Sequence, residues 1–203
     1  MDVGCGNRPF ALATHLADAS LNDNSHRFGL PIPADGRPVV ECSVESMPFE
    51  NKEFDFVFCS HVLEHVEDPV RACRELMRVG RRGYIECPRS WTEYVFSSRE
   101  HRWLVDAERG VLIFREKLTN ECGDPLGVRD ELLPRLARDP LFARHWNSRR
   151  MLRLRNVEFK WEDCFAFLVL RAEDREPSRP GASFERPPRA PYVPFELEVA
   201  TRQ

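Results

Sequence analysis

Two short patterns constrain the fold of this chain more than any other part of its sequence. The first is Asp2-Val3-Gly4-Cys5-Gly6, in which a strand ends and two glycines supply a tight turn. The second is the apolar run Phe54–Ser60, which is typical of a parallel strand covered on both faces. The carboxyl ends of parallel strands meet at one edge of an open α/β sheet, where such sheets bind their ligands. Together the two patterns predict a pocket of nucleotide size at that edge.

The first half of the chain alternates short apolar segments with loops and one helix. Residues 20–37 are rich in Asn, Asp, Gly and Pro and should form a loop. A helix should begin with Asp68 as N-cap and Pro69 at the first helical position, and Gly80 should end it. Strands are expected over residues 2–4, 14–18, 38–42, 54–60 and 83–88. This order predicts an α/β fold, a three-layer sandwich with a mostly parallel, doubly wound, Rossmann-like sheet.

The second half is less regular. Residues 103–106 and 110–114 flank a short polar turn and predict a hairpin. Residues 128–147 should be helical with breaks near Pro134 and Pro140, and residues 157–170 should hold one long strand or two. We expect the hairpin and the late strand to form an antiparallel edge of the sheet.

The domain boundary is expected near Arg171, where prolines begin to alternate with charged residues. The sequence therefore predicts a folded domain over residues 1–171. Residues 172–203 should form a Pro-rich tail that is extended or disordered unless it docks.

Composition narrows the class of protein. The chain has 203 residues, 42% of them hydrophobic, and a net charge of −3, so overall charge points to neither nucleic acid nor a membrane surface. No stretch reaches the roughly 18 apolar residues of a membrane span. The seven cysteines show no C-x-x-C spacing, which favours reduced thiols in the cytoplasm over a disulfide framework or a zinc site.

Several motifs of the first half occur in a meaningful order. They are Asp2 to Gly6, Met47-Pro48-Phe49, Phe54-Asp55-Phe56-Val57, Val62-Leu63-Glu64-His65-Val66 and Arg78-Val79. In this order and spacing they resemble the class I S-adenosylmethionine-dependent methyltransferases, most closely the large bacterial type 11 group. The resemblance covers roughly residues 1–90. It implies that S-adenosylmethionine is the cofactor and that the acceptor is a small molecule or a glycan.

The resemblance also implies roles for single residues. The turn from Asp2 through Gly4 and Cys5 to Gly6 would approach the methionine part of the cofactor, and Asp18 would accept hydrogen bonds from the ribose hydroxyls. Other cofactor contacts would come from Ser43 and Val44 at the adenine and from Ser60, His61 and Leu63 beside the sulfonium. Weaker candidates for the acceptor site are Trp91, Tyr94, His101 and Trp103, from a loop after the fifth strand. His65 is a weak candidate for a general base, because histidine titrates near neutrality.

Three departures from the family pattern motivate an alternative. The chain begins inside the first strand, which implies a truncated N-terminus, and Arg8 stands where a third glycine is expected. Ser43 replaces the acid that often contacts the adenine amine, and it is a weaker acceptor. The alternative is a non-catalytic protein that keeps the fold but binds the cofactor weakly or not at all.

His61-Val62-Leu63-Glu64-His65 also matches the H-x-x-E-H pattern of some zinc peptidases. That chemistry requires the motif inside a helix and a third ligand. Here the motif follows a strand directly, and Pro69 restarts a helix shortly afterwards. A zinc hydrolase is therefore the remote alternative, and we expect no metal site.

Overall fold

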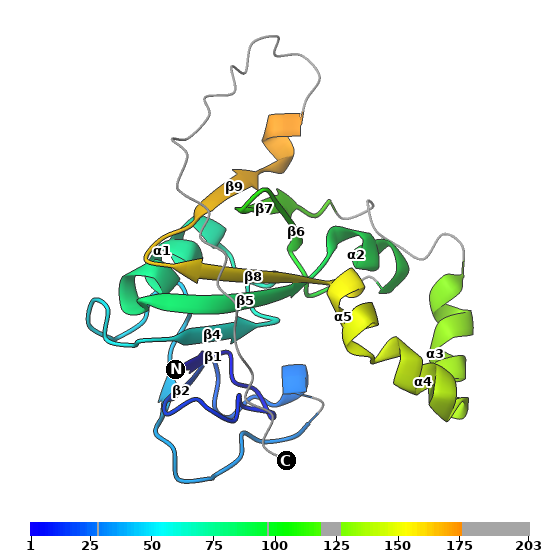
Figure 1. The fold of residues 1–203 in the computed structure, drawn as a ribbon, viewed down its shortest axis with the longest axis horizontal. Helices are drawn as coiled ribbons and strands as arrows, with labels where there is room; N and C mark the ends of the chain where they lie inside the picture. Colours follow the sequence, from blue (N-terminus) through cyan, green and yellow to red (C-terminus); the bar gives the residue numbers. More distant parts are fainter. Residues whose placement is uncertain (28, 97, 119–126, 176–203) are drawn as a thin grey trace.

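The computed structural model describes residues 1–27, 29–96, 98–118 and 127–175, and it shows the predicted α/β fold (Figure 1). Its central sheet has six strands in the order β3-β2-β1-β4-β5-β8. The first five strands are mutually parallel, and β8 pairs antiparallel with β5 at the edge. Their bounds are β1 Asp2–Val3, β2 Leu16–Asp18, β3 Val39–Glu41, β4 Val57–Ser60, β5 Arg82–Pro88 and β8 Asn156–Glu162.

The helix between β4 and β5 confirms the capping prediction. Helix α1 spans Pro69–Val79, and the carboxylate of Asp68 accepts hydrogen bonds from the backbone N–H groups of Val70 and Arg71. Proline at the first helical position loses no hydrogen bond, because that N–H has no partner inside a helix. Gly80 follows the last turn and donates its N–H to the carbonyl of Leu76.

The predicted hairpin is present but lies in a second sheet. Strands β6 (Trp103–Glu108) and β7 (Val111–Glu116) pair antiparallel, and β9 (Ala166–Leu170) adds to β7 in parallel. The expectation that the hairpin would extend the central sheet was therefore wrong. The late apolar segment is two strands, and Asp163, at φ +56°, lies in the turn between them. Strand β8 belongs to the central sheet and β9 to the second sheet.

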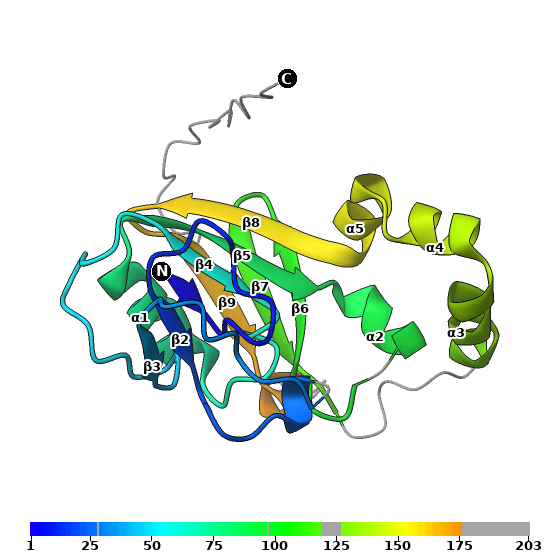
Figure 2. The same ribbon diagram turned by 90° about the horizontal axis from the view of Figure 1, so that it is seen from below.

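Four further helices lie between β5 and β8 in the described part of the chain. The aromatic segment after β5, expected to be a loop, forms helix α2 (Ser90–Phe96). Helices α3 (Val128–Arg138), α4 (Pro140–Trp146) and α5 (Arg149–Arg155) lead into β8. Pro140 begins a new helix as predicted, but Pro134 lies inside α3, so the expected break there was wrong. Figures 1 and 2 show α3 and α4 beyond the end of the central sheet, and neither helix has a buried residue.

One main core joins the layers. The alternate residues Val57 and Cys59 of β4 and Ile85 and Cys87 of β5 pack with Leu76 of α1. The same core takes in apolar side chains of the second sheet and of β8, among them Trp103, Val105, Leu112, Phe114, Val157 and Phe159. Helix α1 and the small sheet therefore cover the same face of the central sheet.

The opposite face of the central sheet is less covered. Phe58 of β4 and Tyr84 of β5 are half-buried there, and their rings stack at 5.4 Å. Phe10, from the loop between β1 and β2, stacks on Phe58 at 4.5 Å. The fourth strand, predicted to be covered on both faces, is therefore fully covered on one face and partly covered on the other. The second face is less covered because a loop, rather than a helix, connects β1 to β2.

Two further predictions concern the C-terminal tail and membrane-spanning segments. The predicted tail falls mostly on residues 176–203, which are outside the described residues. Within the described part of the chain, no helix combines the length and the apolar character that a bilayer span requires.

Candidate functional site

The glycine turn lies at the carboxyl end of β1, where the sequence predicted it. Gly4 and Gly6 have φ values of +69° and +54°, in the left-handed region that favours glycine. A Cβ on Gly4 would lie 2.2 Å from Cγ2 of Val62, in the turn after β4. Gly4 is thus required by the packing of its own chain, because the Val62 side chain fills the space above it.

Asp18 lies beside this turn and is fully engaged by protein groups. Its Oδ2 accepts a hydrogen bond from the N–H of Gly6 at 3.0 Å, and its Oδ1 accepts one from Ser20 at 3.2 Å. The buried guanidinium of Arg27 lies 3.0 Å from the same Oδ1 and also donates to the carbonyl of Ser20. The carboxylate predicted to bind ribose hydroxyls is therefore held by Arg27, a residue that the sequence reasoning missed.

Asp2 is buried under the turn. Its Oδ2 accepts a hydrogen bond of 2.8 Å from the N–H of Phe10, and only 2% of the residue is exposed. Burial raises the pKa of Asp2 to about 6, because the charged carboxylate loses hydration. Burial also raises the pKa of Cys5 to about 12, so that the thiol stays neutral. Both side chains therefore support the turn from below.

The other predicted cofactor residues divide into two groups. Ser43 is exposed and Ser60 half-buried at the carboxyl ends of their strands, where a ligand could reach them. Val44 and Leu63 belong to the apolar core, with 6% and 0% exposure. The side chains of Val44 and Leu63 therefore pack in the core beneath this edge of the sheet.

His61 begins the turn after β4 and has φ +57°, which is uncommon for a residue with a Cβ. Its N–H donates to the carbonyl of Glu86, and its ring lies 3.3 Å from Glu64 and 3.4 Å from Glu86. Burial disfavours the charged imidazole, but the two carboxylates outweigh it and raise the pKa of His61 to about 9. His61 is therefore an imidazolium between two carboxylates.

The residues from His61 to His65 form a turn and not a helix, so the geometry of the zinc-peptidase motif is not present.

The four acceptor-site candidates do not line one surface. Trp91 and Tyr94 are exposed on α2, and the indole N–H of Trp91 donates to the carbonyl of Leu154. Trp103 is 3% exposed and donates its indole N–H to the carbonyl of Val66 at 2.8 Å. Trp103 is therefore a core residue.

His101 and His65 lie together. Their ring centroids are 4.6 Å apart in an edge-to-face arrangement, beside the buried carboxylate of Glu64. Burial lowers the pKa of His65, which favours the neutral ring. The structure thus places His65, the candidate general base, in contact with His101, one of the four candidate acceptor-site residues.

Glu93 completes this group and was missed from the sequence. It is 4% exposed, accepts from Nδ1 of His101, and binds Nζ of Lys117 at 2.8 Å. Burial alone would raise the pKa of Glu93, but His101 and Lys117 lower it below its ordinary value. The sequence signal was weak, because Glu93 and Lys117 stand 24 positions apart, one in a predicted loop and the other beyond the end of a predicted strand.

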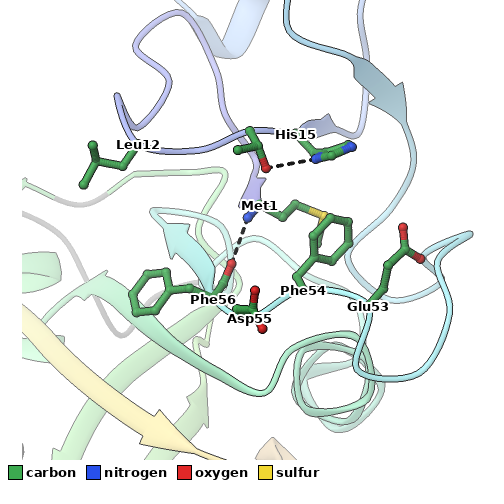
Figure 3. Close-up of a pocket in the computed structure, with 8 residues that line it drawn as sticks. Met1, Leu12, His15, Glu53, Phe54, Asp55 and Phe56 are labelled. Carbon is green, nitrogen blue, oxygen red and sulfur yellow. Dashed lines mark hydrogen bonds between the residues drawn. The ribbon is translucent and has the colours of Figure 1, made fainter.

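A separate hollow lies at the opposite edge of the sheet. It has a volume of about 330 Å³ and lies before the amino ends of β1, β2 and β4 (Figure 3). Met1, His15, Phe54 and Asp55 are among its lining residues, and none of the residues that line it was predicted to bind cofactor. The glycine turn and Asp18 lie at the carboxyl ends of the same strands, so the hollow and the predicted cofactor site are distinct.

Comparison with known families gives a match to the first part of the chain. Residues 1–85 match the family model described as a methyltransferase domain, Methyltransf_11. None of the curated proteins compared with the chain matches it.

Solved structures give partial matches. The YcgJ protein from Bacillus subtilis is 22% identical, with a TM-score of 0.34, and the match covers 43% of each chain. An S-adenosylmethionine-dependent methyltransferase from Thermotoga maritima is 21% identical, with a TM-score of 0.37, covering 49% of this chain and 47% of the other. A methyltransferase of the same cofactor class from Mesorhizobium loti is 16% identical, with a TM-score of 0.37, covering 57% and 55%.

The chain therefore spans roughly half the length of each of these structures. The family match coincides with the strands that carry the glycine turn, Asp18 and the turn after β4. Over residues 1–85, the chain is thus similar to the type 11-like group of class I S-adenosylmethionine-dependent methyltransferases, as the sequence motifs indicated.

Proposed function

We propose that this chain is a methyltransferase that moves a methyl group from S-adenosylmethionine to a small-molecule or glycan-type acceptor. The observation that carries the proposal is the match of residues 1–85 together with the position of the glycine turn and Asp18 at one sheet edge. We further propose that residues 1–171 act as one domain and that the protein works in the cytoplasm, where its cysteine usage fits reduced thiols.

The residues present fit the cofactor at two of its parts. The backbone of Gly4 to Gly6 gives close approach to a ligand, and Ser60 and His61 stand at the end of the neighbouring strand. Bound S-adenosylmethionine supplies an activated methyl group on a sulfonium. The chain's own contribution is then to hold the acceptor in line with that methyl group, since orientation supplies most of such a rate enhancement.

The fit at the ribose requires one rearrangement. Asp18 already accepts from Gly6, Ser20 and Arg27, so ribose hydroxyls can reach it only if Arg27 withdraws. Arg27 comes from the 3-10 turn Ser25–Arg27 in the loop after β2, so its withdrawal would displace a loop and not a strand of the sheet. Ligand binding would thus exchange one set of donors to Asp18 for another.

The ion pair between Asp18 and Arg27 also supports the second candidate function, a non-catalytic protein of this fold. If Arg27 keeps Asp18 occupied, ribose recognition is lost and the cofactor binds weakly. The two candidates differ in a measurable quantity, which is the affinity for the cofactor product.

Calorimetric titration with S-adenosylhomocysteine tests both. The methyltransferase proposal expects micromolar binding by the 203-residue chain, at least tenfold weaker binding by Asp18→Asn, and unchanged binding by Asp35→Asn. Asp35 is a suitable control because it is a partly exposed carboxylate that also pairs with an arginine, Arg37. Tighter binding by Arg27→Gln than by the wild type would show that the ion pair competes with the ligand. A cooperatively melting protein that binds no ligand, even with Arg27 replaced, would overturn the enzyme and leave the non-catalytic candidate.

A further inference from the structure

Glu64 is an unusual carboxylate in this fold. It is 1% exposed, and neither of its oxygens accepts a hydrogen bond from any residue in the described part of the chain. The nearest cation is His61, whose Nδ1 lies 3.3 Å from Oε1 without hydrogen-bond alignment. Burying a carboxylate is costly unless it is paired and hydrogen-bonded or coordinates a metal. The carboxylate of Glu64 therefore requires a partner that the hydrogen bonds of the described residues do not provide.

Two imidazole rings face this carboxylate. One ligand atom each from Glu64, His65 and His101 lies within 4.8 Å of the others. The three residues come from two segments, the turn after β4 and the residues just before β6. Two imidazoles and one carboxylate form a ligand set that zinc and non-haem iron sites use.

The outer ring nitrogens are held as they are in metal sites. Nδ1 of His65 lies 3.2 Å from the carbonyl of Glu100, and a carbonyl can only accept, so that nitrogen carries the proton. Nε2 is then the unprotonated nitrogen, and it lies 4.0 Å from Oε1 of Glu64. Nδ1 of His101 is held by the carboxylate of Glu93, which Lys117 fixes in turn. Imidazoles that bind metal usually donate their other N–H to a carbonyl or carboxylate in this way.

The backbone fixes the two segments against each other. The carbonyl of Glu64 accepts hydrogen bonds from the N–H groups of Arg102 and Trp103, at 2.8 and 3.1 Å. The indole of Trp103 donates to the carbonyl of Val66 at the end of the same turn. Three hydrogen bonds therefore hold the turn that carries Glu64 and His65 against the segment that carries His101.

We propose that Glu64, His65 and His101 bind one divalent transition-metal ion, with zinc or ferrous iron as the best match to the donors. Bonds of about 2.0–2.2 Å would bring the donor atoms to within about 3–4 Å of each other, so the side chains close by about 1 Å on binding. Glu93 and the carbonyl of Glu100 act as outer partners that orient the two rings. The site lies outside the residues proposed to hold the cofactor and does not depend on the methyltransferase proposal.

The surrounding charges are compatible with a cation. Glu64 belongs to the cluster, Glu93 contacts His101, and Glu86 is connected to Glu64 through His61. The basic partners of these carboxylates outside the cluster are His61 and Lys117.

Metal titration of the untagged chain tests the site. All proteins carry Cys164→Ser, because Cys164 is an exposed thiol and cysteine thiolates are zinc ligands. After removal of metal with a chelator, calorimetry with Zn²⁺ should show one equivalent bound, and Co²⁺ should give the visible absorption of a protein-bound ion. Glu64→Gln and His101→Gln should each weaken Zn²⁺ binding at least tenfold, and Glu93→Gln should weaken it by about 10–100-fold as an outer partner.

A matched histidine provides the control. His15 lies at the amino end of β2 and contacts Thr14, so His15→Gln should bind Zn²⁺ like the parent. Zn²⁺ should also raise the melting temperature of the parent and of His15→Gln but not of Glu64→Gln. Far-UV circular dichroism checks that each variant is folded. Less than a tenth of an equivalent bound by the folded parent, or equal binding by the parent and Glu64→Gln, would overturn the proposal.

Discussion

The carboxylate of Asp18 lies 3.0 Å from the guanidinium of Arg27, and the pair closes the loop that follows β2. The side chains are 13% and 7% exposed, so the ion pair is shielded from solvent. Arg27 also donates to the carbonyls of Ser20 and Leu21 and to the side chain of Asn24. Arg27 therefore holds together residues 18–27, the first part of the segment between β2 and β3.

Replacing Arg27 by Gln should lower the free energy of unfolding by about 2 kcal/mol, because buried hydrogen-bonded groups lose their donor. Urea denaturation at pH 7 measures the change. A double-mutant cycle with Asp18→Asn should give a coupling energy of at least about 1 kcal/mol. The exposed Arg81, 3.6 Å from Asp55, is the control, and Arg81→Gln should change stability by at most about 0.5 kcal/mol. A coupling energy near zero would contradict the buried pair.

Gly4 and Gly6 allow the cost of a clash to be separated from the cost of a dihedral angle. Both have positive φ, but a Cβ on Gly6 meets only a carbonyl at 4.0 Å, whereas a Cβ on Gly4 overlaps Val62. Gly6→Ala should cost about 1–2 kcal/mol of stability from the left-handed conformation alone, and Gly4→Ala should cost clearly more. Thermal unfolding measures both.

The companion change Val62→Ala identifies the cause. In the Gly4→Ala background it should recover part of the lost stability, whereas in the wild type it should destabilise by opening a space beside the turn. Equal costs for Gly4→Ala and Gly6→Ala would mean that Val62 moves aside freely and that Gly4 is not needed for packing.

The fold could be predicted from the sequence because its signals are local. The Asp68-Pro69 start of α1, the alternating apolar residues of β5 and the Gly4 turn each depend on neighbours a few positions away. The pairing of the hairpin with β9 could not be predicted, because β7 and β9 are separated by 49 residues and no local rule selects the partner. Pro134 is tolerated inside α3 because that helix is exposed and has little packing to lose.

The candidate site was predictable only in part, for the same reason. The family motifs gave the turn residues, but Arg27 carries no signal within its Asn- and Asp-rich loop. The grouping of Glu64 and His65 with His101 depends on how β6 packs against the turn after β4. The remote zinc-hydrolase alternative through His61, Glu64 and His65 required a helix, whereas the turn places His61 between Glu64 and Glu86.

Two buried tryptophans should respond differently to the same substitution. The indole N–H of Trp103 donates to the carbonyl of Val66, whereas Nε1 of Trp161 has no hydrogen-bond partner among the described residues. Trp103→Phe leaves a buried carbonyl without its donor, so it should cost about 1–3 kcal/mol beyond the loss of ring contacts. Trp161→Phe removes a buried N–H that had no partner and should cost less.

Denaturation by guanidinium chloride measures both variants under one condition. The comparison is informative because both residues are nearly fully buried, at 3% and 7% exposure. A larger cost for Trp161→Phe would show that its contacts with Gly80 and Gly83 dominate over hydrogen bonding.

Asp2 should make the stability of the chain fall as pH rises from 4 to 7. Its pKa is about 6 in the folded protein, raised by burial, and about 3.8 when unfolded. The folded state therefore binds the proton more tightly, so its contribution to stability is complete below pH 4 and is lost as pH passes 6. A difference of this size corresponds to roughly 3 kcal/mol at most.

Asp2→Asn removes the buried charge and keeps an oxygen that can accept from the N–H of Phe10. Without ligand, the variant should therefore be more stable than the wild type by about 1–2 kcal/mol at pH 7 and similar to it at pH 4. Urea denaturation at pH 4, 5, 6 and 7 measures the profile. Asp55→Asn is the control, because the Asp55 side chain is 90% exposed and its variant should follow the wild type at every pH. If Asp2→Asn is instead less stable by the same amount at all four values, the hydrogen bond to Phe10, and not the ionisation of Asp2, sets the stability of the turn.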